Sequence, residues 1–183
     1  MSVGASSVFD ALAREAVEES ELWREALMPP GEWEADAIFS RLAPDRYALA
    51  IESIYEGYLL HYGRPRIFAP HDPDVAVLLG DYLYAHGLVR LAEAGRAEDV
   101  LDFAELISLC AQLRAGAAPG DGVAWLATSA LIGTGDPRLD RARAALRLER
   151  ETAPFVTLVE SCAPAEDVDR ALAAHARRFA SFG

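Results

Sequence analysis

The chain has 183 residues, of which 52% are hydrophobic and 25% are charged, a composition typical of a folded globular protein and not of a disordered one. Its net charge of −12 argues against a nucleic-acid-binding surface, because phosphate binding needs clustered Lys and Arg. The length suits one domain with a sizeable core, which we place over residues 1–183.

The first half of the chain predicts a series of helices. One covers 8–28 and stops at Met-Pro-Pro-Gly, and a short one follows over 32–42. The next starts with Pro44 in its first turn and runs to His61. The stretch His-Asp-Pro-Asp at 71–74 caps a long helix that ends at Gly95, and another helix covers 96–116.

The second half continues in the same way after the loop Ala-Ala-Pro-Gly-Asp-Gly. Four more helices are predicted, over 123–133, 137–153, 154–162 and 165–182. Almost no stretch alternates apolar and polar residues as a half-buried strand does. The sequence therefore predicts an all-α helical bundle of about eight or nine helices, several of them about 18–25 residues long.

Cysteine usage and the absence of targeting signals bear on the compartment. Cys110 and Cys162 lie within apolar helical patterns and no Cys-x-x-Cys is present, which predicts buried free thiols in a reducing compartment. The first 20 residues lack a basic segment followed by an apolar one, and no apolar run reaches the roughly 18 residues that a membrane span needs. We expect a cytoplasmic protein without a membrane span.

The motifs of the commonest enzyme classes are missing. No Glu is followed by His three residues later, so a carboxylate-bridged di-metal site in a helical bundle is poorly supported. The sequence also lacks a G-x-S-x-G elbow, a phosphate-binding P-loop and a dinucleotide-binding glycine motif. We predict neither a metal site nor a cofactor.

Several carboxylates have the spacing of one helix face. Glu52 and Glu56 lie four residues apart, as do Glu98 and Asp102. Such rows could bind Mg²⁺, but a solvated face is the commoner explanation and is the one we expect. Asp81 lies in an apolar stretch and is expected to be buried, so it either pairs with a group on a neighbouring helix or orients a molecule in a cavity.

Two stretches resemble the trans-isoprenyl (polyprenyl) diphosphate synthase family. AVLLGDYLYA at 76–85 is similar to the family helix A-V-L-x-G-D-Y-L-x-A, and ALAIESIYEGYLLH at 48–61 is similar to A-x-x-I-E-x-I-H-x-x-x-L-x-H. In the family, the second His of that motif is followed at once by D-D-x-x-D and then by R-R-G-x-P. Here His61 is followed by Tyr-Gly-Arg-Pro, so only the Gly-x-Pro turn remains.

The second aspartate pair of the family is also missing, because Val159 and Glu160 stand in its place. The family's reaction ionises an allylic diphosphate, whose charge is stabilised by Mg²⁺ ions held between the two aspartate clusters. The resemblance therefore implies a reduced isoprenoid synthase fold that has lost its catalytic residues, and we expect no prenyl transfer by this chain alone.

Three functions fit this resemblance. The first is a non-catalytic partner or regulatory subunit of an active polyprenyl synthase, in a hetero-oligomer with it, with a homodimer as the other assembly. The second is a stand-alone protein that binds an isoprenoid or another lipid-like ligand in the old cavity. The third is an enzyme with altered chemistry there. No catalytic residue is assigned, and the candidate ligand-binding residues are His61, Arg64, Arg66, Asp81 and Tyr84.

Overall fold

A computed structural model describes residues 5–180, which form nine α-helices, three short 3₁₀ helices and no β-strand. This confirms the predicted all-α bundle. The α-helices are α1 (Ala5–Glu19), α2 (Glu21–Ala26), α3 (Ala48–Tyr62), α4 (Pro73–Ala94), α5 (Ala97–Ala115), α6 (Asp121–Leu131), α7 (Arg138–Glu149), α8 (Ala153–Cys162) and α9 (Ala165–Arg177). The 3₁₀ helices are η1 (Pro30–Glu32), η2 (Ser40–Leu42) and η3 (Asp45–Tyr47).

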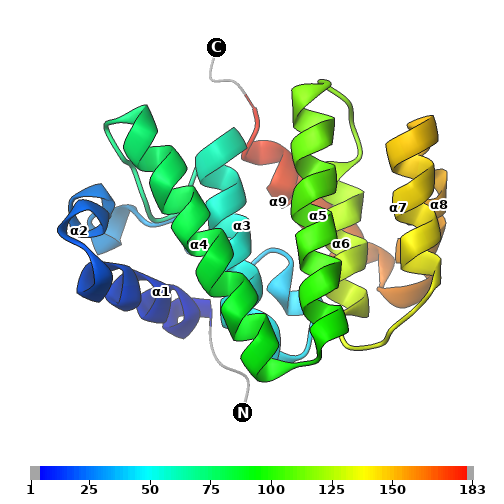
Figure 1. Cartoon of the computed structure of the whole chain (residues 1–183), viewed down its shortest axis with the longest axis horizontal. Helices are drawn as coiled ribbons and strands as arrows, with labels where there is room; N and C mark the ends of the chain where they lie inside the picture. The colour runs from blue at the N-terminus through cyan, green and yellow to red at the C-terminus, as the bar shows by residue number, and fades with distance from the viewer. Residues whose placement is uncertain (1–4, 181–183) are drawn as a thin grey trace.

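Helix α3 lies at the centre of the fold. Every residue from Ala50 to Leu60 is buried, so neighbours cover this helix on all sides. Helix α4 packs along its length, α1 and α2 lie at one end of the molecule, and α7 and α8 lie at the other end (Figure 1). Most of the buried apolar side chains form one core between α3, α5, α6, α8 and α9.

Three glycines allow α3 and α4 to approach closely. A Cβ atom at Gly57 would lie 2.8 Å from the carbonyl oxygen of Gly80, and one at Gly87 would lie 2.3 Å from Cγ1 of Ile54. Real Cβ atoms do not come this near to other heavy atoms, because atomic overlap at such distances is strongly repulsive. The GDYL stretch of α4 therefore packs against α3 through backbone contact.

The predicted first helix is divided at Ser20. This residue has an extended backbone, and its hydroxyl accepts a hydrogen bond from the amide of Leu22 at 3.2 Å, so it caps a new helix. A Ser in an apolar-periodic stretch is compatible with helix interior and with a cap alike, and periodicity alone did not distinguish the two. The helix over 8–28 is therefore two helices, α1 and α2.

The helix predicted over 32–42 is wrong. Residues 33–37 have no regular secondary structure, and only 40–42 of the predicted range are helical, as the 3₁₀ helix η2. Main-chain hydrogen bonds tie this part of the chain to the turn at 64–69. The amide of Glu34 donates to the carbonyl of Arg66 at 2.9 Å, that of Met28 donates to Ile67 at 2.9 Å, and that of Ala69 donates to Ala26 at 2.8 Å. The main chain of this segment is thus satisfied by a distant turn, a partner that local pattern does not reveal.

The other predicted helices are present with shifted ends. Asp72 caps α4 by accepting a hydrogen bond from the amide of Asp74 at 2.8 Å, as the His-Asp-Pro-Asp stretch predicts. Only α4 and α5 reach the predicted length range, with 22 and 19 residues. The last helix ends at Arg177, and residues 181 and 182 of its predicted range lie outside the described part of the chain.

Helix α4 is apolar although much of it is exposed to solvent. By length and composition it is the one helix within residues 5–180 that could cross a membrane, and only 28% of its most apolar 18-residue window is buried. Core helices of globular proteins can have the same length and composition, so a single such helix is weak evidence for a span. Its backbone contact with α3 is that of a bundle helix.

Candidate functional site

Three of the five candidate residues lie together where α3 ends beside α4. His61 Nε2 lies 3.2 Å from Asp81 Oδ1, and the His61 ring stacks on Tyr84 with ring centres 5.1 Å apart and an angle of 15° between the planes. Gly80 leaves room for this imidazole, since a Cβ there would lie 2.6 Å from Nε2. Burial raises the pKa of the Tyr84 hydroxyl well above its ordinary value, so this group stays neutral.

The expectation that Asp81 is buried is wrong. Its side chain is 65% exposed and faces solvent, although its neighbours Gly80 and Leu83 are buried. The error arises because α4 carries apolar residues on its solvent-facing side as well as on its buried side. The His61–Asp81–Tyr84 group is therefore a surface feature and not the lining of an interior cavity.

Arg66 does not join this group and cannot contact a solution anion. Its side chain is fully buried, where Nε donates to Glu56 Oε2 at 2.8 Å and Nη1 donates to Glu52. Burial would lower the pKa of Arg66, but the charges of Glu52 and Glu56 outweigh burial and raise it. The guanidinium also lies over the rings of Phe9 and Tyr55.

The expectation that Glu52 and Glu56 form a solvated face is also wrong. Both are fully buried, and Glu56 Oε1 accepts hydrogen bonds from the amides of Arg66 at 2.7 Å and Ile67 at 3.0 Å. Glu52 accepts from Arg66 and from both the amide and the hydroxyl of Ser40. These carboxylates are occupied by the fold, so they are not placed to bind Mg²⁺.

The second acidic row, on α5, faces arginines of α7. Asp102 accepts a hydrogen bond from Arg143 at 2.8 Å, and Glu105 accepts one from Arg147 at 2.7 Å. These pairs border a groove of about 480 Å³ between the two helices. Within residues 5–180, no group of three or more His, Cys, Asp or Glu side chains is arranged to hold a metal ion.

A buried polar network that the sequence did not predict lies where α3, α5, α6 and α9 meet. Asp121 Oδ2 accepts hydrogen bonds from Tyr58 at 2.6 Å and from Arg114, and lies 3.0 Å from His175 Nε2. The other ring nitrogen of His175 lies 2.9 Å from the hydroxyl of Tyr55. Burial raises the pKa of Asp121, but His175, Tyr58 and Arg114 outweigh it, so the pKa lies far below its usual range.

This Tyr55–His175–Asp121 chain has the order of groups that a proton relay would need. However, aromatic rings fill the space around it. Phe39 stacks on Trp125 with ring centres 5.5 Å apart, Tyr55 meets Trp125 edge to face, and all three side chains are completely buried. The network thus joins four helices in the centre of the bundle. His175 could have been noticed in the sequence, because it is a polar residue among the apolar positions of an amphipathic helix. Its partners could not, because Asp121 and Tyr55 lie 54 and 120 residues away in the chain.

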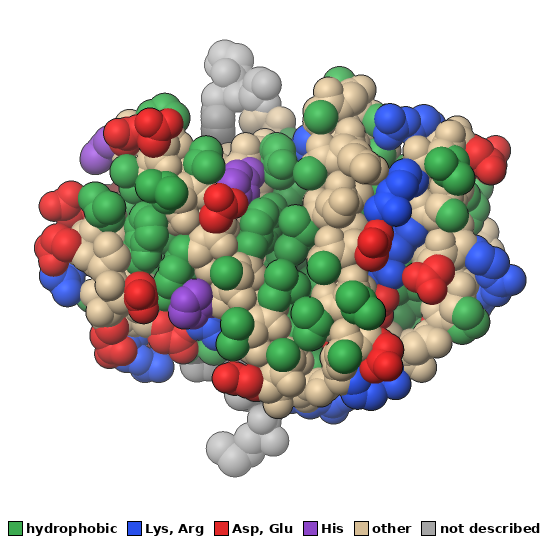
Figure 2. Space-filling model, in the orientation of Figure 1, with side chains coloured by type: hydrophobic (Ala, Val, Ile, Leu, Met, Phe, Trp, Pro, Cys, Tyr) green, Lys and Arg blue, Asp and Glu red, His purple; other side chains and the backbone are tan. Residues whose placement is uncertain are grey.

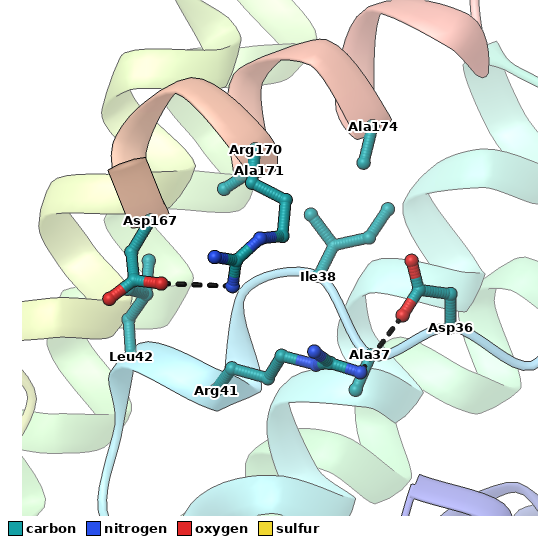
Figure 3. Close-up of a pocket in the computed structure, with 9 residues that line it drawn as sticks. All are labelled: Asp36, Ala37, Ile38, Arg41, Leu42, Asp167, Arg170, Ala171 and Ala174. Atoms are coloured by element: carbon teal, nitrogen blue, oxygen red, sulfur yellow. Dashed lines mark hydrogen bonds and ion pairs between the residues drawn. The ribbon is translucent and has the colours of Figure 1, made fainter. Parts of the chain in front are cut away.

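Figure 3 shows a small hollow between the 3₁₀ helix η2 and α9. Arg41 and Arg170 reach into it, but Arg41 is paired with Asp36 at 3.2 Å and Arg170 is paired with Asp167 at 2.9 Å. The hollow measures about 60 Å³, the space of about two water molecules. It is too small and too well neutralised to serve as an anion site.

Arg64 is the one candidate residue that borders a larger apolar cleft. This cleft measures about 320 Å³ and lies beside the Gly-Arg-Pro turn, where α3 ends and α4 begins. Arg64 forms an ion pair with Glu34 on its rim. The five candidate residues therefore occupy three separate places: the His61 group on the surface, Arg66 in the core, and Arg64 at this cleft.

An extended apolar surface lies over α4 and α5. Figure 2 shows hydrophobic side chains gathered across the middle of this face, with charged side chains gathered toward its two ends. Val77, Leu78 and Val89 of α4 are 47%, 54% and 57% exposed, and Leu101 of α5 is 64% exposed. We call this surface, with Tyr62 at its edge, the α4–α5 face. Exposed apolar side chains gathered on one side of a protein are candidates for an interaction site.

No family model, curated protein or solved structure matches this chain. The resemblance to the isoprenyl diphosphate synthases therefore stays a prediction from the two motif-bearing stretches at 48–61 and 76–85.

Proposed function

We propose that the chain is a non-catalytic subunit that binds a catalytic isoprenyl diphosphate synthase through its α4–α5 face. The observation that carries this proposal is the exposure of Leu78, Val89 and Leu101, each more than half accessible. Because each is about half exposed, burying it against a partner would recover roughly 1–2 kcal/mol, about half the value for a fully exposed side chain. A partner with a complementary apolar helix face would recover that free energy.

The size of the face suits a protein partner. The 22 residues of α4 extend about 33 Å, and two adjacent helices are about 20 Å wide, which gives roughly 650 Å². A stable interface takes about 800 Å² from each partner. The α4–α5 face with its rim residues is therefore close to the area that one partner contributes.

Support for a non-catalytic role comes from the end of α3. Gly63 follows Tyr62 directly at the helix C-terminus, and its amide bonds to the carbonyl of Leu59 at 2.8 Å. There is no room in this short turn for the aspartate motif that follows the corresponding His in the synthases. The buried glutamates of α3 cannot replace that motif, because Arg66 occupies them.

The two alternative functions have weaker support. Aromatic side chains occupy the centre of the bundle, which disfavours a lipid-like ligand there. The grouping of His61, Asp81 and Tyr84 favours altered chemistry, but its Asp81 is 65% exposed and the group borders the α4–α5 face. In our proposal the partner covers it.

The test is the assembly state of the full chain, measured by light scattering after size exclusion, alone and mixed with a full-length isoprenyl diphosphate synthase from the same organism. We expect a heteromer that Leu78→Glu or Val89→Glu weakens by at least about tenfold, since a buried charge is strongly disfavoured. Leu148→Glu is the matched control, because Leu148 is 78% exposed and belongs to α7 rather than to α4 or α5.

The outcomes separate the possible occupants of the face. A monomer that ignores the synthase would contradict the proposal. A homodimer that the same two substitutions dissociate would replace the synthase with a second copy of this chain. Flotation with lipid vesicles, lost in Leu78→Glu but not in Leu148→Glu, would assign the face to a membrane.

A further inference from the structure

The cleft beside Arg64 combines an apolar floor with a charged rim. It lies where the segment after α2, the end of α3 and the start of α4 meet. Its charged residues are Glu32, Glu34 and Arg64, and its apolar lining consists of Met28, Leu60, Pro65, Phe68, Ala69, Pro70 and Ala76. A volume of about 320 Å³ falls in the range of small-molecule sites.

Two arginines converge on a single carboxylate at this rim. Glu34 Oε2 accepts a hydrogen bond from Arg64 Nη2 at 3.2 Å and forms an ion pair with Arg178 Nη2 at 2.9 Å, and Oε1 accepts from Arg64 Nη1. The amide of Arg64 also donates to the carbonyl of Arg178 at 3.0 Å, which fixes the two residues beside each other. The Glu34 carboxylate therefore occupies, from within the chain, the position at which a pair of guanidinium groups could bind an external anion.

The arginine pair is incompletely neutralised. Arg178 is only 7% exposed, yet its Nη1 finds no hydrogen-bond acceptor within the described part of the chain. Arg66, whose charge also acts on Arg178, is already paired with both Glu52 and Glu56. Burial lowers the pKa of Arg178, Glu34 raises it, and the charges of Arg66 and Arg64 lower it further. A second anionic oxygen near Arg178 would be stabilised by this arrangement.

Glu34 can be displaced without disturbing the core. Its side chain is 47% exposed, and its place in the fold is fixed by a main-chain bond to Arg66 that does not involve the carboxylate. The Glu34–Arg64 pair is exposed and contributes little to stability. Arg178 is buried and needs an acceptor, which the incoming anion supplies in place of Glu34. An incoming anion that makes the same contacts and also buries an apolar chain would therefore compete effectively.

We propose that this cleft binds a single-chain amphiphile with a compact anionic head. The head takes the place of the Glu34 carboxylate on Arg64 and Arg178, and the chain lies over Leu60, Phe68 and Ala76. If each carbon takes roughly the 30 Å³ that a water molecule takes in the liquid, the cleft holds about ten carbons. This inference is independent of the partner-binding role, because the cleft does not include the α4–α5 face.

The test is calorimetric titration of the full chain with decanoate, decyl phosphate and decanol below their aggregation concentrations. We expect one molecule of either anion to bind, and decanol to bind at least about tenfold more weakly. Preference for decanoate or for decyl phosphate identifies the head group. Equal binding of decanol would overturn the proposal, because the arginines would then play no part.

Substitutions at the rim of the cleft distinguish two explanations for tighter anion binding: displacement of the Glu34 carboxylate from the arginines, and a general reduction of negative charge. Glu34→Gln should bind either anion about tenfold more tightly, since the internal competitor is gone. Glu32→Gln is the matched control, because it removes the same charge from the same rim without freeing an arginine. The double variant Glu34→Gln, Arg64→Gln should lose the gain, and Ala69→Trp, which fills the cleft from its exposed edge, should weaken both anions.

Two results would contradict the proposal. One is an equal gain in Glu32→Gln and Glu34→Gln, which would indicate simple relief of negative charge. The other is no binding to Glu34→Gln while its circular dichroism and melting temperature match those of the unaltered chain. If Glu34→Gln melts early, Ala69→Trp in the unaltered background, which keeps the ion pairs, decides the question.

Discussion

Arg66 Nε lies 2.8 Å from Glu56 Oε2, and neither side chain has any contact with solvent. With Glu52 on the other side of the guanidinium, three charged groups occupy the core of a bundle that is otherwise largely apolar there. Such a group is expensive to dehydrate, and it is tolerated only while each member keeps its partners. The integrity of this triad therefore determines whether the end of α3 and the turn at 64–69 stay together.

Replacing Arg66 should be among the most damaging single changes in the chain. Arg66→Met leaves Glu52 and Glu56 buried without a counter-charge, and we expect a loss of about 3–5 kcal/mol in the free energy of unfolding. Urea denaturation measures this. Arg24→Met is the control, because Arg24 pairs with Glu21 at the surface, and it should cost less than about 1 kcal/mol. Similar losses in the two variants would contradict the structural account.

The network around Asp121 predicts an acid-sensitive stability. The pKa of Asp121 is lower in the folded chain than its unfolded value of about 3.9, so the unfolded state binds more protons at low pH. The stabilisation is complete above about pH 4 and is lost as the pH falls toward the folded pKa. Urea unfolding at pH 7 and pH 3 should show a large loss for the unaltered chain.

Asp121→Asn checks the origin of that loss. It should be less stable at pH 7 by roughly 1–3 kcal/mol, because it weakens hydrogen bonds to a charged group, and its stability should change less between pH 7 and pH 3. Asp169→Asn controls for the loss of one negative charge at an exposed position of α9. An unaltered pH dependence in Asp121→Asn would assign the acid sensitivity to other carboxylates.

The contact between α3 and α4 predicts a strict need for glycine at 87. Gly87→Ala places a methyl group 2.3 Å from Cγ1 of Ile54 and 3.0 Å from the carbonyl oxygen of Ala50, so the helices must separate. We expect destabilisation of about 1–3 kcal/mol, measured by thermal unfolding. Gly31→Ala is the control, since nothing lies within 4 Å of its added methyl group. It should leave the melting temperature nearly unchanged or raise it slightly.

The two cysteines should differ in their reactivity toward a thiol reagent such as DTNB. Burial raises the pKa of the fully buried Cys110 thiol well above its ordinary value, whereas Cys162 is half-buried at the end of α8. We expect Cys162 to react first and Cys110 to react only when the chain unfolds. In Cys162→Ser, native protein should therefore release almost no chromophore. Fast release from that variant would show that the core opens around Cys110.

Helix α3 explains how far the sequence could predict the fold. Its apolar residues and its end at Gly63 were predictable, and so were the long helix after Asp72 and the loop before Asp121. The burial of Glu52 was not predictable from spacing, because a row of acids four residues apart is equally typical of a solvated face. The signal that could have indicated burial was the sequence context. Glu52 and Glu56 interrupt a run from Ala50 to Leu60 whose remaining residues are all small or apolar enough to lie in a core.

The candidate site was only partly predictable for the same reason. Sequence comparison selected His61, Asp81 and Tyr84, which do lie together, because the two motifs lie on adjacent helices. It could not separate Arg64 from Arg66, which are two residues apart and yet have opposite environments. In a turn, consecutive side chains follow the path of the main chain rather than a fixed period, so only coordinates reveal which arginine is accessible.

The main-chain bonds between the segment 26–34 and residues 66–69 have a consequence for the order of folding during synthesis. The amides of Met28 and Glu34 leave the ribosome well before the carbonyls of Ile67 and Arg66 that will accept from them. Until then these amides remain bonded to water, and α1 and α2 lack the surface against which they pack. The N-terminal part of the fold, with α1 and α2, can therefore reach its final packing only after α3 has been synthesised. A ribosomal pause just before Arg66 would prolong the exposure of the apolar side of α1.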